Sequence, residues 1–244
     1  MALVNHRSRE IHFKIVYYGP GSGGKTTNLR ILHSHLPADR RGRLLAIANE
    51  QERTLFFDFL PVDLGRIQGY STRVHLYTVP GQVYYKLSRR VVLQGVDGVV
   101  FVADSHPARA SANFDSREDL IFQLEEIGLT PEERAKLPWV FQYNKRDLPG
   151  VMPIERMRAA LNTAGAPDFE AVAVDGRGVS ETLKAACKSV LNSFTRVVGA
   201  AIAPAPSPPV AAPPLPPMPP SVAARSTGLR RAWRSRASRA SRAS

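Results

Sequence analysis

The chain has one cysteine, Cys187, among its 244 residues. A single thiol excludes a disulfide framework and every metal cluster that needs several cysteines. No apolar run approaches the roughly 20 residues that a membrane-spanning helix requires, and the opening MALVNHRSRE has no apolar core of the signal-peptide kind. The final Ser-Arg-Ala-Ser offers no cysteine for prenylation. We therefore expect a cytoplasmic protein.

Acidic residues are absent after Glu181. Residues 200–244 hold seven arginines, and ten of the 20 prolines fall between Pro204 and Pro220. The formal net charge of +12 therefore drops to +5 for residues 1–199, where 26 Lys and Arg face 21 Asp and Glu. Proline at this density forms neither a helix nor a strand ladder. The composition predicts a globular domain over 1–199 and, over 200–244, a disordered Pro-rich linker with an Arg/Ser-rich basic tail.

Apolar and amphipathic segments alternate through the globular part. Continuous Val, Ile, Phe and Tyr content is typical of strands that are covered on both faces. We expect strands over 12–19, 96–104, 137–144 and 169–174, and helices over 26–36, 84–93, 111–127, 153–161 and 179–198. This alternation predicts a doubly wound α/β sheet with ligands at the carboxyl ends of its strands.

One segment, residues 54–79, breaks this alternation. Its second half alternates between apolar and polar residues with a period of two, as an antiparallel pair at a sheet edge does. We expect a mostly parallel sheet with this hairpin on one edge.

Residues 19–26, GPGSGGKT, match the pattern G-x-x-x-x-G-K-[ST] of a phosphate-binding loop, or P-loop. The motif follows a predicted strand and opens a predicted helix, which is the context that its chemistry needs. Backbone N–H groups of the glycine-rich loop surround a phosphate, and the helix N-terminus adds positive potential. Lys25 would neutralise the β and γ oxygens. The hydroxyl of Thr26 would bind Mg²⁺, which prefers hard oxygen ligands.

A second motif, Asn144-Lys145-Arg146-Asp147, distinguishes GTP from ATP. It follows a predicted buried strand and so lies at the same sheet edge as the P-loop. The carboxylate of Asp147 can accept hydrogen bonds from the ring N–H and exocyclic amine of guanine, and adenine offers neither donor. A buried carboxylate left unpaired would reject adenine. Asn144 would brace the loop or meet the base, and the stem of Lys145 would cover the ring.

The chain resembles the Ras-like small GTPases, and among them the MglA-type proteins of bacterial gliding motility and cell polarity. The resemblance covers residues 10–198 and rests on FKIVYYGPG, GKTTNL, ERTLFFDFLP, HLYTVPGQV, GVDGVVFVADS and NKRDLP. It implies the three-layer α/β fold of P-loop NTPases, GTP or GDP with Mg²⁺ as ligands, effectors that bind the GTP state, and an MglB-like roadblock-domain GTPase-activating protein. It also implies a monomer when no partner is present, with recruitment to a cell pole or membrane surface.

The same resemblance assigns the switch residues. Thr54 takes the place of the switch threonine that senses the γ-phosphate through Mg²⁺, so Thr26 and Thr54 form the expected metal set. Gly81 would offer its N–H to the γ-phosphate, and Gln82 would orient the attacking water. Arg53 could act as an arginine finger in cis; the alternative is a solvated arginine paired with Glu50 or Glu52. The aspartate that usually supports Mg²⁺ is replaced by Thr78.

The nucleotide-binding set expected from motifs and resemblance together is large. It comprises Gly19, Gly21, Ser22, Gly23, Gly24, Lys25, Thr26, Thr27, Thr54, Gly81, Asn144, Lys145, Asp147, Ala173 and Val174, with Gln82 and Arg53 as the catalytic pair. Two other functions stay open at this point. One is a scaffold that holds nucleotide without turnover, suggested by Thr78; the other is a module that binds acidic lipid or nucleic acid through the basic tail.

Overall fold

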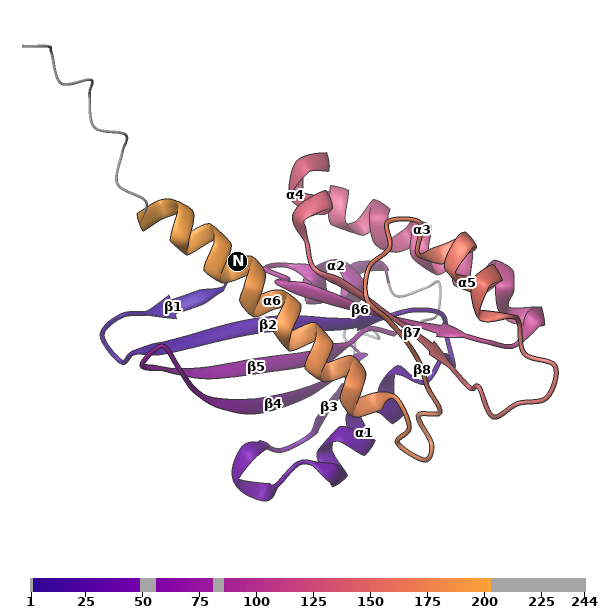
Figure 1. Cartoon of the computed structure of the whole chain (residues 1–244), viewed down its shortest axis with the longest axis horizontal. Coiled ribbons are helices and arrows are strands. Elements are labelled where there is room, and N and C mark those ends of the chain that lie inside the picture. The colour runs from indigo at the N-terminus through magenta and orange to yellow at the C-terminus, as the bar shows by residue number, and fades with distance from the viewer. Residues whose placement is uncertain (1, 49–55, 81–85, 203–244) are drawn as a thin grey trace, which may run out of the picture. The chain divides into compact units, whose positions relative to one another are not determined.

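The computed structural model describes residues 2–48, 56–80 and 86–202. The predicted tail and the switch residues Arg53, Thr54, Gly81 and Gln82 lie outside these ranges, so the predictions made for them stay predictions. Within the described residues, α-helices and β-strands alternate for most of the chain, and a run of three consecutive strands interrupts the alternation (Figure 1).

The described residues form one eight-stranded sheet with the order β3-β4-β5-β2-β6-β7-β8, and β1 pairs with β2. The strands are β1 (Leu3–Asn5), β2 (Glu10–Tyr18), β3 (Leu45–Ala48), β4 (Phe56–Ile67), β5 (Tyr70–Thr78), β6 (Gly98–Asp104), β7 (Trp139–Asn144) and β8 (Asp168–Glu170). Neighbours from β5 to β8 are parallel. The pairs β3–β4, β4–β5 and β1–β2 are antiparallel.

Helices connect these strands. They are α1 (Lys25–His35), α2 (Lys86–Leu93), α3 (Ala110–Glu126), α4 (Pro131–Lys136), α5 (Ile154–Leu161) and α6 (Val179–Ile202), with short 3-10 turns η1 (Ala38–Arg40) and η2 (Pro107–Arg109). Thr130 starts α4 through a capping box with Glu133, in which each side chain accepts a hydrogen bond from the other residue's backbone N–H. None of these helices is both long and apolar enough to cross a membrane.

Two apolar cores lie on opposite faces of the sheet. One joins Phe13 and Ile15 of β2 to Leu29 of α1 and Val190 of α6. The other joins the alternate residues Val16 and Tyr18 of β2 to helices α2, α3 and α5. Successive residues of a strand point to opposite faces, so β2 contributes to both cores. The predicted three-layer α/β fold is thereby confirmed.

The antiparallel edge of the sheet was predicted, but the strands that form it differ from the prediction. Within the predicted segment, β4 and β5 do form a hairpin, and β5 also pairs parallel with β2. Because β4 pairs with β3 on its other side, β3 is the outermost strand of this edge. The sequence prediction missed β1, β3 and α4, which are short and have too few residues for a clear period. The strand expected over 169–174 is limited to Asp168–Glu170.

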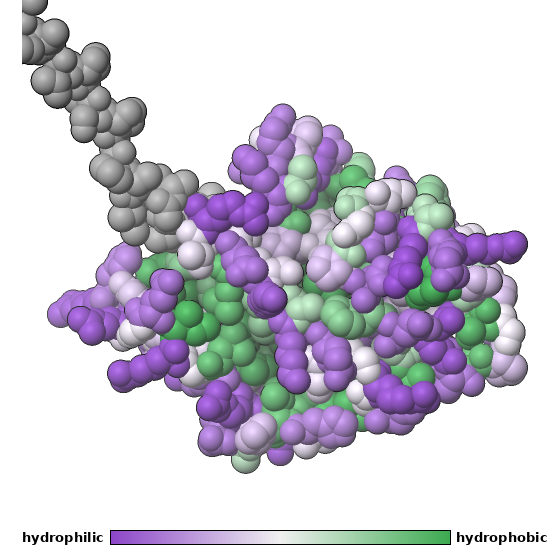
Figure 2. All heavy atoms as spheres, in the orientation of Figure 1, coloured by the Kyte–Doolittle hydropathy of each residue, from purple (hydrophilic) through white to green (hydrophobic). Residues whose placement is uncertain are grey.

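The surface on the side of α6 is partly apolar. Figure 2 shows apolar residues gathered in a band alongside α6, over the neighbouring strands. A groove of about 690 Å³ lies between α6 and β4, with Val62, Ile67 and Leu183 in its lining and Lys184 and Lys188 at its side. The sheet is thus incompletely covered on this face.

A buried polar network fixes α1 against the sheet. The Asn28 amide donates to the carbonyl of Gly24 at 2.9 Å and to Oε1 of Gln142 at 2.8 Å. Gln142 donates in return to Asn28 Oδ1 at 2.9 Å and to Thr182 Oγ1 at 3.0 Å. Both amides are fully buried. The network ties the helix that follows the P-loop to β7 and α6.

The packing of α6 on β6 requires a glycine at position 98. A Cβ atom built on Gly98 would lie 2.5 Å from Cγ2 of Val190. We expect Gly98→Ala to lower the free energy of unfolding by about 1–3 kcal/mol, the usual cost of overpacking a core. Urea denaturation at fixed nucleotide concentration measures it. In a Val190→Ala background the methyl group is gone, so the added cost of Gly98→Ala should fall; an equal cost in both backgrounds would contradict this account.

Candidate nucleotide-binding site

The P-loop runs from Gly19 to Gly24, between the end of β2 and the start of α1. Gly19 has φ +140°, and a Cβ there would lie 2.2 Å from the carbonyl oxygen of Val102. Gly24 has φ +104°, and a Cβ there would lie 2.1 Å from Nδ2 of Asn144. Both positions therefore require glycine for conformation and for space. Ser22 also adopts a positive φ, 62°, on the exposed side of the loop.

Lys25 is buried at the first position of α1. Its Nζ donates to the carbonyl oxygens of Gly19 and Pro20, both at 2.7 Å. Burial lowers the pKa of Lys25 to about 7, with a further lowering by the charges of Arg89 and Arg109 and an opposing effect of Asp58. An ammonium group that is desolvated among other cations favours the binding of an anion. The loop, the helix N-terminus and Lys25 together have the geometry and charge that suit a phosphate.

A carboxylate that the sequence reasoning did not single out lies beside this site. Asp58 Oδ2 accepts hydrogen bonds from the hydroxyls of Thr26 at 2.6 Å and Thr78 at 2.8 Å. The backbone N–H of Asp58 donates to Thr78 Oγ1 at 2.9 Å. Asp58 is on β4, one residue beyond the Phe59–Tyr77 pair, so the antiparallel register brings it next to Thr78. A carboxylate therefore lies beside Thr78, on the adjacent strand.

The oxygen atoms of Thr26 and Asp58 fit a magnesium ion. A hydroxyl and a carboxylate are hard ligands of the kind that Mg²⁺ takes, usually together with waters and phosphate oxygens. Thr54, the other predicted ligand, lies outside the described residues. In the described part of the chain, no three His, Cys, Asp or Glu side chains are grouped so as to hold a metal. The donor set thus suits a metal shared with a bound phosphate.

The NKRD motif lies directly beside the P-loop. Asn144 Nδ2 donates to the carbonyl of Gly23 at 2.8 Å, and Asn144 Oδ1 accepts from the backbone N–H of Ala173 at 2.8 Å. One buried amide therefore joins the phosphate loop to the loop that follows β8. Ala173 itself is buried, and Val174 is 71% exposed.

Two of the three charged residues of the motif, Lys145 and Asp147, differ in environment. Lys145 has φ +65° and donates through Nζ to Asp104 Oδ2 at 2.7 Å. Asp147 is exposed, although the sequence argument treats this carboxylate as buried. Asp147 lies in the turn after β7, at the protein surface.

The geometry therefore brings the P-loop, a metal-compatible oxygen pair and the NKRD motif together at one sheet edge. No family model matches the chain. It is 53% identical to the mutual gliding-motility protein MglA of Myxococcus xanthus (strain DK1622) over 196 residues, 80% of this chain and 99% of that protein. The chain belongs to the MglA family of small GTPases. The resemblance drawn from the motifs is confirmed.

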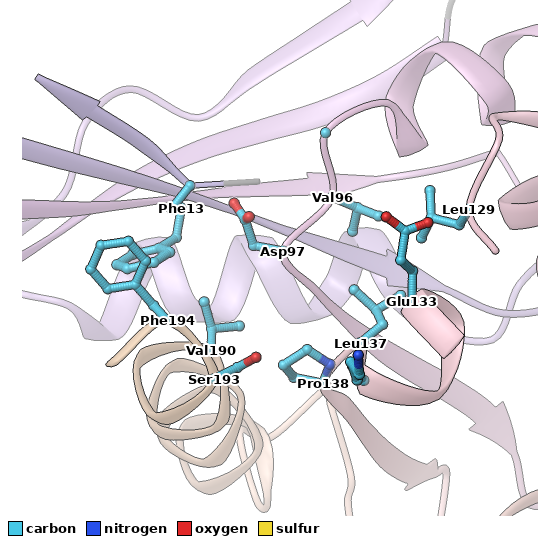
Figure 3. Close-up of a pocket in the computed structure, with 13 residues that line it drawn as sticks. Phe13, Val96, Asp97, Leu129, Glu133, Leu137, Pro138, Val190, Ser193 and Phe194 are labelled. Carbon is cyan, nitrogen blue, oxygen red and sulfur yellow. The ribbon is translucent and has the colours of Figure 1, made fainter. Parts of the chain in front are cut away.

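The P-loop site of this MglA-family chain is distinct from a cavity of about 370 Å³ shown in Figure 3. Phe13, Pro138 and Phe194 are among its lining residues. Phe13 lies early in β2 and Pro138 precedes β7, so the cavity lies toward the amino ends of these strands, away from the P-loop. Its lining includes the carboxylates of Asp97 and Glu133. Lys136 is also in the lining, so two carboxylates face one cation, a balance that does not favour a phosphate.

Proposed function

We propose that the protein is a molecular switch that binds GTP, hydrolyses it to GDP and recruits effectors in its GTP state, in bacterial gliding motility or cell polarity. The observation that carries the proposal is the Asn144 side chain, which bonds Gly23 of the P-loop and Ala173 of the adjacent loop. Membership of the MglA family supports it. The cytoplasm, with recruitment to a cell pole, is the proposed location.

Guanine selectivity would come from Asp147. Its carboxylate accepts from two guanine donors, and an asparagine in its place offers only one acceptor oxygen beside an NH₂ group. We expect Asp147→Asn to weaken GTP and GDP binding by about 100-fold and to favour xanthine nucleotides, because the variant loses a charge-assisted hydrogen bond and sets an NH₂ donor against a guanine donor. Competition titration with GTP, xanthosine triphosphate and ATP measures the change.

Asp115→Asn, which alters an exposed aspartate on α3, is the matched control and should leave all three affinities unchanged. If the unmodified protein binds ATP as tightly as GTP, the assignment of Asp147 to the base is wrong. Without that assignment, the proposal of a GTP-driven switch also fails.

Magnesium would be held by Thr26, Thr54 and Asp58 together with nucleotide phosphates. The ion would neutralise phosphate charge and so slow nucleotide release. The hydrogen bonds of Thr26 and Thr78 to one oxygen of Asp58 support a metal-supporting role for this carboxylate. In this proposal Thr78 orients the Asp58 carboxylate and is not itself a metal ligand.

Asp58→Asn tests this assignment. In the unmodified protein, chelation of Mg²⁺ should speed the release of a fluorescent GDP by about tenfold or more, the effect of losing a charge-assisted contact. In Asp58→Asn, release should already be fast, and chelation should add little. Asp63→Asn, on the same strand, is the control. A normal response to chelation in Asp58→Asn would remove Asp58 from the metal site.

Hydrolysis would depend on Gln82 and Arg53, with Gly81 and Thr54 sensing the γ-phosphate. Gln82 orients the attacking water, and Arg53 neutralises charge as the γ-phosphoryl group leaves. Apolar surface for a partner lies close in sequence to these segments. It comprises the exposed Leu87 and Val91 of α2 and the half-buried Phe59 and Tyr77, whose rings are 4.9 Å apart. A roadblock-domain GTPase-activating protein is the proposed regulator.

We expect Gln82→Leu and Arg53→Ala to bind GTP normally while partner-stimulated turnover falls, by about 10³ to 10⁵ for an arginine finger. Single-turnover phosphate release with and without the roadblock partner measures the rate, and equilibrium titration measures affinity. A full rate in Arg53→Ala identifies Arg53 as a solvated residue. No turnover in the unmodified protein, with or without partner, favours the nucleotide-holding scaffold.

A further inference from the structure

Arg109 reaches the P-loop from a separate part of the chain. It ends the 3-10 turn η2, between β6 and α3, and belongs to neither nucleotide motif. Its Nη2 donates to the carbonyl oxygen of Gly21 at 2.8 Å, across 88 positions in the sequence. The side chain is 39% exposed, so its guanidinium group lies at the mouth of the loop rather than beneath it.

The contact with Gly21 continues the pattern set by Lys25. Lys25 Nζ donates to the carbonyls of Gly19 and Pro20, and Arg109 donates to the next carbonyl along the loop. Three consecutive carbonyls of the phosphate loop therefore hold two cations. A carbonyl oxygen accepts a hydrogen bond but does not neutralise the charge of its donor.

The acidic group near Arg109 is shared. Arg109 Nε lies 3.9 Å from Asp104 Oδ2, and the same oxygen accepts from Lys145 Nζ at 2.7 Å. The buried Asp104 therefore pairs closely with Lys145 and only loosely with Arg109. The charge of Arg109 also acts on the phosphate loop, where it contributes to the lowered pKa of Lys25. The three cations Lys25, Arg109 and Lys145 outnumber the two carboxylates Asp104 and Asp58, and such an excess of positive charge favours the binding of a polyanion.

We propose that Arg109 is a second phosphate-contacting residue that binds the β- and γ-phosphates of the nucleotide beside Lys25. The proposal rests on the nucleotide-binding function proposed above. A guanidinium group has five N–H donors in a planar fork, so a contact with Gly21 and contacts with phosphate oxygens can coexist. The lysine of this motif reaches the β- and γ-phosphates, and Arg109 occupies the carbonyl next to those that Lys25 uses.

Dissociation constants of GTP, GDP and GMP test the assignment. Arg109→Ala should weaken GTP and GDP binding by about tenfold or more, the value of a charge-assisted hydrogen bond, and should change GMP binding less than about twofold. Arg109→Lys keeps the positive charge but loses the planar set of guanidinium donors, so its loss of GTP and GDP affinity should be intermediate. Arg73→Ala removes the same charge from β5, where Arg73 pairs loosely with Asp63 at 4.0 Å, and should change none of the three.

Two results would overturn the proposal. One is that the GTP and GDP affinities of Arg109→Ala stay within about threefold of those of the unmodified protein, because so small a change does not fit the loss of a charged contact. The other is an equal loss for GMP, which shows a general effect on the loop. Should Arg109→Ala fail to fold, Arg109→Lys and Arg109→Gln provide the same comparison. If the unmodified protein prefers ATP, the base assignment fails, and ATP, ADP and AMP then test Arg109 independently.

Discussion

The side-chain amide of Asn144 is the contact on which the site depends. It donates to Gly23 and accepts from Ala173, so the end of β7 fixes the phosphate loop and the loop after β8 in one step. The contact demands glycine at position 24, because a Cβ there would strike the amide nitrogen. A buried amide with only one of these partners would leave a polar atom unpaired at a cost of about 1–3 kcal/mol. The P-loop, the NKRD turn and the loop after β8 therefore depend on one another for their positions.

Parallel strands explain why this junction exists. β2, β6 and β7 are adjacent and parallel, so the P-loop, Asp104 and the NKRD motif emerge at the same sheet edge. Asp104 ends β6 and bonds Lys145, which follows β7. The sheet thus brings residues more than 100 positions apart to within hydrogen-bonding distance without any long-range loop. The antiparallel strands β4 and β3 lie beyond β5 and extend the sheet on one side.

The local motifs could be predicted from the sequence because each is continuous. GPGSGGKT and NKRD contain their own turns, and the strands that precede them are strongly apolar. Asp58 could not be found this way, since its role depends on the register of β4 against β5, which pattern alone does not give. A signal was present: Asp58 interrupts the apolar run FFDFLP. The contact between Arg109 and Gly21 had no local signal, because it joins two turns that only the fold brings together.

The reciprocal bonds of Asn28 and Gln142 have a consequence for how this sequence can diverge. Each amide serves as donor and acceptor for the other, and Thr182 takes a further bond from Gln142. Replacing one member alone leaves a buried polar group without its hydrogen-bond partner. Exchanging the whole set for apolar residues of similar shape can leave the stability of the protein nearly unchanged. Positions 28, 142 and 182 should therefore covary across relatives, changing as a set or not at all. Such a pattern would show that relatives keep the orientation of α1 against the sheet.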